Sequence, residues 1–194
     1  MTDQVETSVE EKIINAAINC LEKYGVEGST NRVIAKEAGI NSAAINYYFR
    51  SKDVLIQKVM ERTMDHAFDW SDFPDDPGLT AQQRCYNIFN HLIEGGVNFP
   101  GITRAHFHDL LAEGNYDALV VKRLNIFTRQ LVDDLESHGY NGSRADLELS
   151  IMQIMNAAFM SILVPHLYKD SLNLDLSDPD TRHSFLEKLT AILK

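Results

Sequence analysis

Apolar residues recur at helical spacing along nearly the whole chain, and no segment shows the sustained alternation of a half-buried strand. Ser8 and Glu11 have the spacing of a capping box, and Gly25 stands where the first helix would end in a left-handed cap. The pattern therefore predicts an all-α protein with about nine helices. They are expected at residues 8–24, 30–38, 42–48, 52–70, 80–95, 102–113, 116–137, 143–163 and 180–193.

Two segments interrupt the helical pattern. Residues 71–78 contain two prolines and three aspartates, which cannot continue a helix, and they are interpreted as a linker. Residues 165–179 are bounded by prolines and are interpreted as a second break before the last helix.

Composition narrows the class of protein. The chain has 194 residues, a net charge of −10 and two cysteines in no Cys-x-x-Cys pair, so no disulfide framework or thiolate metal site is expected. No apolar run is long enough to span a membrane, and the acidic N-terminus is unlike a secretory signal. The expectation is a cytoplasmic protein without a membrane partner.

Charge is unevenly distributed along the chain. Residues 28–60 hold five basic and two acidic side chains, whereas residues 61–194 hold 11 basic and 20 acidic ones. A short basic segment on an acidic body favours local contact with a polyanion and argues against a protein that coats nucleic acid.

Residues 30–49 have the pattern of a helix-turn-helix. Two helices this short need tertiary support, and Ile34, Ala38, Ile40, Ile45 and Tyr48 are expected to form their inner faces. Gly39 can adopt the positive φ of a sharp turn, and Asn41 can cap the next helix.

The outward face of the second short helix would then present small or hydrogen-bonding groups to the major groove. The predicted DNA-binding residues are Thr30, Arg32, Ser42, Ala43, Asn46, Tyr47, Ser51 and Lys52. Asn46 can pair with adenine, contact a phosphate or bond within its own helix, and these alternatives stay open. Hydroxyls, Lys52 and a helix N-terminus bind phosphates, which position the protein without reading sequence.

This segment resembles the DNA-binding domain of TetR-family transcriptional regulators. The resemblance is in the run Thr30–Asn41, with its Ile-Ala…Ala-Gly spacing, and in the run Ala44–Leu55, with Tyr47-Tyr48-Phe49 and Arg50-Ser51-Lys52-Asp53. It covers about residues 8–60 and implies a DNA-binding domain over 1–51 and an effector-binding and dimerisation domain over 52–194. Asn46 departs from the family pattern, in which many members have tyrosine.

The resemblance implies a homodimer that binds a palindromic operator and a small, mainly apolar effector. Helices at about 143–163 and 180–193 would form the dimer interface, although their apolar stripes fit an internal core equally well. The candidate effector-binding residues are Phe68, Phe89, His106, Phe107, Phe127, Met155 and Phe159, each of which also has a plain reading as core.

No site for catalysis or a metal is assigned. His106 and Asp109 share a helix face, but no third ligand is evident, so neither metal nor cofactor is expected. No phosphate loop or hydrolase motif is present, and the protein is not expected to be an enzyme. A ligand-released repressor is the favoured function; control by a protein partner, activation, or a helical enzyme or scaffold are the alternatives.

Overall fold

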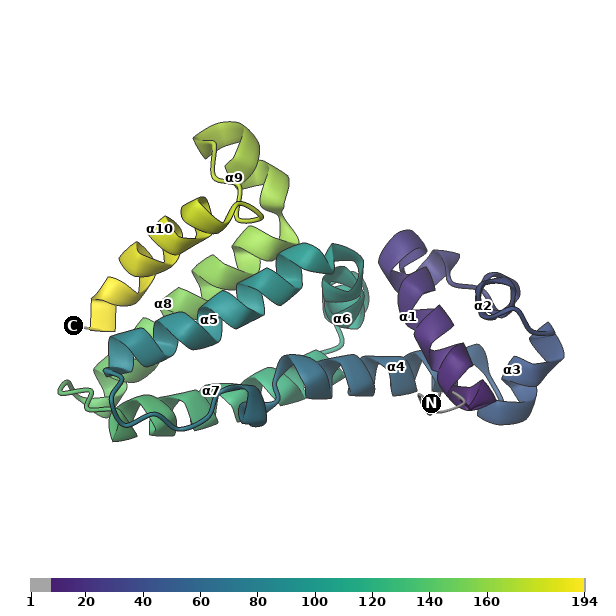
Figure 1. Cartoon of the computed structure of the whole chain (residues 1–194), viewed down its shortest axis with the longest axis horizontal. Helices are drawn as coiled ribbons and strands as arrows, with labels where there is room; N and C mark the ends of the chain where they lie inside the picture. Colours follow the sequence, from purple (N-terminus) through teal and green to yellow (C-terminus); the bar gives the residue numbers. More distant parts are fainter. Residues whose placement is uncertain (1–7, 194) are drawn as a thin grey trace, which may run out of the picture.

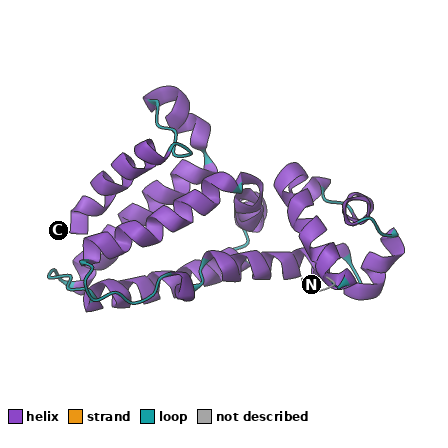
Figure 2. Cartoon of the chain, in the orientation of Figure 1, coloured by secondary structure: helices purple, strands orange, loops and turns teal. Residues whose placement is uncertain are grey.

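The computed structural model describes residues 8–193, and these residues form ten α-helices and two short 3-10 helices without a strand (Figure 2). The all-α prediction is confirmed. The α-helices are α1 (Val9–Gly28), α2 (Asn31–Ala38), α3 (Ser42–Phe49), α4 (Lys52–Ala67), α5 (Ala81–Asn98), α6 (Pro100–Glu113), α7 (Leu119–Ser137), α8 (Arg144–Leu163), α9 (Pro165–Leu172) and α10 (Pro179–Thr190). The 3-10 helices are η1 (Trp70–Asp72) and η2 (Ala191–Leu193).

Helices α1 to α3 and the first half of α4 form an N-terminal unit at one end of the molecule (Figure 1). Its core contains Ile13, Leu21, Ile34, Ile45 and Leu55, each of which is fully buried. Helices of eight residues are unstable alone in water, so burial of Ile34 and Ile45 in this core is what keeps α2 and α3 folded.

Side-chain caps set where these helices begin. Thr30 accepts a hydrogen bond from the Val33 amide, Asn41 from Ala43 and Ser51 from Val54, at 3.3, 2.9 and 3.2 Å. Ser8 accepts the Glu11 amide at 3.2 Å, whereas the Glu11 carboxylate forms an ion pair with Arg62 of α4 at 2.6 Å. Each cap satisfies a backbone donor that helix geometry leaves free.

Helices α5, α7, α8 and α10 enclose a second core in the C-terminal body. The linker between α4 and α5 is fastened to this body by the guanidinium of Arg84, which is almost fully buried. Arg84 donates to both carboxylate oxygens of Asp134 at 2.9 and 3.0 Å and to the carbonyls of Phe73 and Pro74. The predicted linker is thus irregular in backbone and fixed in position.

The predicted break at residues 165–179 is wrong in its first half, because Pro165–Leu172 forms α9. Pro165 occupies the first turn, where proline's missing N–H costs no hydrogen bond, and Asn173 ends the helix in the left-handed region at φ 54°. The described residues contain no single helix that is long and apolar enough to cross a membrane; α8 and α9 meet that test only as a pair bent by 89°.

Helix α6 joins the N-terminal unit to the body. Ile102 and Ala105 of α6 belong to the N-terminal core, and the Glu22 carboxylate of α1 accepts the Ile102 amide at 2.9 Å. Gly101 lies against the Glu22 backbone so closely that an added Cβ would overlap the Glu22 carbonyl. Glycine is required here for close approach of two helices.

Gly101→Ala is expected to force α6 away from α1 and to lower the free energy of unfolding by about 1–3 kcal/mol, the usual cost of overpacking. Gly95→Ala is the matched control, because no atom lies within 4 Å of a Cβ added there and α5 is helical at that point. It should stabilise the protein by about 0.5–1 kcal/mol. Urea unfolding measures both; equal effects of the two substitutions would contradict the close contact at Gly101.

Candidate nucleic-acid interface

The turn between α2 and α3 has the geometry that the sequence predicts. Gly39 has φ 67° and ψ 32°, and the amides of Gly39 and Ile40 donate to the carbonyls of Lys36 and Ala35 at 3.3 and 3.0 Å. These bonds satisfy the last carbonyls of α2 while the chain reverses. Together with the Asn41 cap, they fix the angle at which α3 leaves α2.

Helix α3 turns its polar face to solvent at the end of the molecule farthest from α10 (Figure 1). Ser42, Ala43, Asn46 and Tyr47 are all exposed, and 82% of the Tyr47 surface is accessible. The prediction that Tyr48 lies on the inner face is wrong: Tyr48 is 43% exposed and packs edge-on against Tyr47, while Phe49 is buried. Phe49 replaces it because Ile45 and Phe49, four residues apart, share the face toward α1 and α4.

Asn46 has a partner that sequence reasoning missed. The Asn31 side-chain amide donates to Asn46 Oδ1 at 3.3 Å, from the first turn of α2. This bond orients the Asn46 amide group and leaves its N–H donors exposed. Bidentate pairing with adenine needs both the oxygen and the N–H group, so it would require Asn46 Oδ1 to exchange Asn31 for the base.

The predicted phosphate-binding groups lie around α3, and they differ in which of their hydrogen-bonding atoms are already used within the protein. Thr30 and Ser51 use an oxygen as a helix cap, and each retains a hydroxyl proton that can be donated. The Lys52 ammonium donates to the Val26 carbonyl at 2.9 Å, so it holds the start of α4 against the end of α1. Lys52 can donate two further hydrogen bonds.

Basic charge on this end of the molecule extends beyond the predicted set. Lys36 and Arg50, which are outside that set, are exposed and, like the predicted Arg32, have no acidic partner within 4.0 Å among the described residues. Arg50 ends α3 with φ 65°, a backbone conformation that residues other than glycine rarely adopt. Its backbone is held by a 3.0 Å bond from its amide to the Asn46 carbonyl. The sequence pattern does not predict this geometry, because the residue at position 50 is arginine and not glycine.

The candidate effector-binding residues are spread through the body. Phe89 and Phe127 are fully buried, Phe68 packs on Phe127 at 5.0 Å between ring centres, and Thr128 donates to the Met155 sulfur at 3.3 Å. Phe107 contacts Phe159 at 5.8 Å. Two hollows in the body, described below, are lined by other residues, so the role of these side chains in ligand binding stays a prediction.

His106 connects α6 to α4. One ring nitrogen is 3.1 Å from the Thr63 hydroxyl, whereas Nδ1 is buried without a hydrogen-bond partner. Burial lowers the pKa of His106 from its ordinary value of 6.5 to about 4, so the ring is neutral at pH 7. A neutral ring fits a structural contact between two helices.

A possible metal-binding group lies nearby but excludes His106. The ligand atoms of His108, Asp109 and Glu113 lie within 4.8 Å of one another, and Glu27 of α1 is 3.9 Å from His108 Nε2. Asp109 and Glu113 are exposed, and water solvates such carboxylates well. No ion is assigned to this group.

The N-terminal unit is similar to known proteins. Residues 13–59 match the family model of bacterial regulatory proteins of the tetR family. The chain is 26% identical over 86 residues to the HTH-type transcriptional regulator BetI of Vibrio atlanticus, covering 43% of each chain. It is 36% identical over 56 residues to the probable HTH-type transcriptional regulator YttP of Bacillus subtilis, covering 29% of this chain and 27% of that one. The aligned part thus spans less than half the length of these relatives.

Solved structures match over nearly the whole chain. A transcriptional regulator from Rhodococcus sp. Rha1 has a TM-score of 0.73 at 17% identity and covers 96% of both chains. FadR of Bacillus subtilis, in complex with stearoyl-CoA, has a TM-score of 0.61 at 14% identity and covers 94% of this chain and 96% of its own. At such identities the likeness shows the fold alone. Residues 13–59 thus match the tetR family, and the whole chain shares the all-helical fold of these solved regulators.

His106 should make the stability of the protein depend on pH. Because its pKa is lower in the folded state than in the unfolded state, its contribution is complete above about pH 6.5 and is lost as the pH falls toward 4. In His106→Gln, an amide replaces the ring and can still bond Thr63, so the loss of stability between pH 7 and pH 5 should be smaller than in the parent.

Urea unfolding at both pH values measures this difference. His108→Gln is the control, since that ring is on the same helix and its side chain is 30% exposed. If His106→Gln and His108→Gln change the pH dependence equally, the effect does not come from the buried ring.

Proposed function

We propose that this protein is a transcriptional regulator that binds duplex DNA through α3. The observation that carries this proposal is the exposed face of Ser42, Ala43, Asn46 and Tyr47 on a helix held rigidly by caps and by Ile45. An α-helix fits the major groove, and none of these side chains has a charge to desolvate. Arg32, Lys36 and Arg50 supply positive charge for the flanking phosphates.

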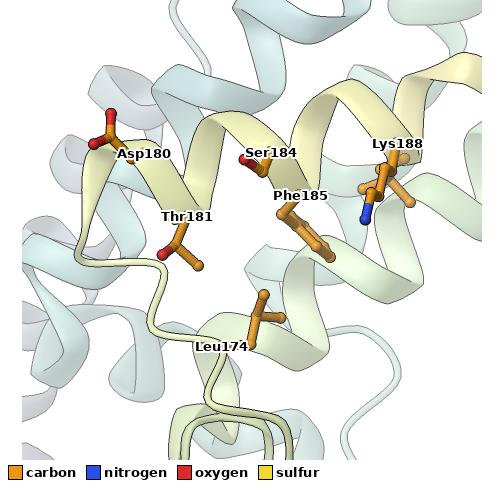
Figure 3. Close-up of a pocket in the computed structure, with 7 residues that line it drawn as sticks. Leu174, Asp180, Thr181, Ser184, Phe185 and Lys188 are labelled. Carbon is orange, nitrogen blue, oxygen red and sulfur yellow. The ribbon is translucent and has the colours of Figure 1, made fainter.

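This function calls for a dimer, because one eight-residue helix contacts few bases, whereas a twofold dimer contacts two half-sites. The outer side of α10 provides an unfilled groove of about 530 Å³ (Figure 3). Phe185, Leu189 and Leu174 give the groove an apolar floor, while Asp180 and Lys188 flank it. Helix α8, which α10 also contacts beside its main packing on α5, exposes Leu149 and Met152. The proposed partner for this surface is a second copy of the chain.

The proposed mode of control is release from DNA by a small, mainly apolar effector, which makes the protein a repressor. The likeness in fold to FadR, which was solved with stearoyl-CoA, supports a ligand-binding body. Helices α4 and α6 both contact the N-terminal unit and the body, so a ligand that favours one arrangement of the body would move α3. This function places the protein in the cytoplasm with the DNA and assigns it no catalytic step.

Selection of duplexes from a random pool, followed by fluorescence anisotropy, tests DNA recognition. The selected sequence should be palindromic, and it should bind at least ~10³-fold more tightly than a scrambled duplex at physiological salt. Equal binding to both duplexes would reject sequence recognition, and no binding at low salt would favour a helical enzyme or scaffold.

Asn46→Ala should weaken binding to the selected duplex by about 1–3 kcal/mol and leave binding to scrambled DNA nearly unchanged, if Asn46 reads a base. Lys52→Ala is the comparison, because a phosphate contact should weaken binding to both duplexes and reduce the salt dependence. Anisotropy titrations at two salt concentrations measure both variants. Equal losses on both duplexes for Asn46→Ala would assign Asn46 to a phosphate.

The dimer surface is tested with Met152→Glu on α8 and Phe185→Glu on α10, both of which should give monomers at micromolar concentration because a carboxylate would be buried between copies. Leu111→Glu is the control, since Leu111 is an apolar residue of α6 that is 69% exposed. Sedimentation velocity measures the mass, and circular dichroism checks folding. Dimers that persist in folded Met152→Glu and Phe185→Glu would place the interface elsewhere.

A further inference from the structure

A second cavity, of about 380 Å³, lies where α5 and α8 end and α6 and α9 begin. It is lined by none of the candidate effector-binding residues. Its volume is within the range of about 300–1,000 Å³ that is usual for small-molecule sites. The cavity exists because α9 and the loop after it, which lie within the predicted break at residues 165–179, fold over the ends of α5 and α8.

The wall and the rim of this cavity differ in character. Val97, Ile162, Leu163, Leu174 and Leu176 give it an apolar wall, to which Gly96 adds bare backbone. Apolar surface of this kind favours a ligand with a hydrocarbon body. A neutral wall alone would not select among such ligands.

Among the charged groups at the rim of the cavity, one positive charge is not neutralised by a neighbouring acidic group. Lys169 and Asp175 face the cavity as a pair at 2.6 Å, and the Ser177 hydroxyl also donates to Asp175 at 2.7 Å. These contacts lower the pKa of Asp175 to about 2, so its charge is present and already compensated. Arg104, which also lines the cavity, has no acidic partner within 4.0 Å among residues 8–193.

Two further polar groups point to the kind of anion that Arg104 could bind. The guanidinium is a planar donor that matches a carboxylate in bidentate geometry. His166 and Tyr168 of α9 line the same cavity and can donate further hydrogen bonds. We propose that this cavity is a binding site for a small monocarboxylate with an apolar body, whose carboxylate pairs with Arg104.

The site also has a route to the N-terminal unit. Arg104 lies on α6 between Ile102, whose amide is held by Glu22 of α1, and Ala105, which is part of the N-terminal core. A carboxylate bound at Arg104 would therefore act within one helical turn of the contact between α6 and α1. This consequence rests on the proposed DNA-binding function, whereas the binding site itself does not.

Calorimetric titration of the full chain without DNA tests the site, with octanoate and 4-phenylbutyrate as probes. The corresponding primary amides are controls for the apolar body alone. At least one carboxylate should bind about 10-fold or more tightly than its amide, since a charge-assisted hydrogen bond contributes more than a neutral one. Lack of binding by both carboxylates at about 1 mM, or equal binding of acids and amides, would overturn the proposal.

Three variants locate the site. Arg104→Gln should abolish the preference for carboxylate over amide, and Val97→Phe should weaken binding of both by filling the cavity. Arg129→Gln is the matched control, because Arg129 is an exposed arginine of α7 that does not line the cavity. A preference that survives in Arg104→Gln would contradict the role of Arg104, and circular dichroism confirms that each variant is folded.

Adding the bound carboxylate to the complex of protein and selected duplex tests the link to DNA. A change in DNA affinity that is lost in Arg104→Gln supports regulation from this site. Carboxylate binding that leaves DNA affinity unchanged would reject the regulatory consequence and keep the site, and failure to bind any DNA would reject the proposed function separately.

Discussion

The contact between α6 and α1 at Gly101 constrains the rest of the molecule. Here two helix backbones meet without an intervening side chain, and Glu22 caps α6 across the junction. Ile102 and Ala105 then place the first turn of α6 in the core of the N-terminal unit. Because the middle of the same helix contacts α4 through His106 and α8 through Phe107, a rearrangement of the body around α6 also affects α1. A protein interior is close-packed, so such a contact transmits displacement.

The presentation of α3 depends on this packing more than on helix propensity. Its eight residues are held by two buried anchors, Ile45 and Phe49, and by caps at both ends. The buried side leaves the opposite face for solvent, which is why small and polar residues at Ser42, Ala43 and Asn46 are tolerated. The bond between Asn31 and Asn46 adds a polar tie between α2 and α3, and any base contact by Asn46 must compete with it.

Local chemistry made the N-terminal unit predictable from sequence. Gly39 and Asn41 each have one dominant local function, a sharp turn and a helix cap, and the structure uses them accordingly. The pattern does not show that Tyr48 is exposed, because Tyr47, Tyr48 and Phe49 are adjacent aromatics and tertiary packing alone decides which one is buried. In the body, helical spacing alone does not show whether Phe89 and Phe127 belong to the core or line a pocket. Their environment depends on helices that are distant in sequence. Helix α9 does not follow from the pattern, because prolines at 165 and 179 mark boundaries without indicating what lies between them.

The position of Arg104 matters for how two ligand signals could combine. Aromatic side chains such as Phe107 lie farther along α6 than Arg104, which is next to the turn held by Glu22. A ligand at either place acts on the same helix, and its effect on DNA binding is limited by its difference in affinity between the two arrangements of α6. Coupling energies between sites are typically about 1–3 kcal/mol, similar to the cost of disturbing one close contact. The cost of disturbing the packing of α6 on α1 around Gly101 is therefore of the size that a bound small ligand can supply.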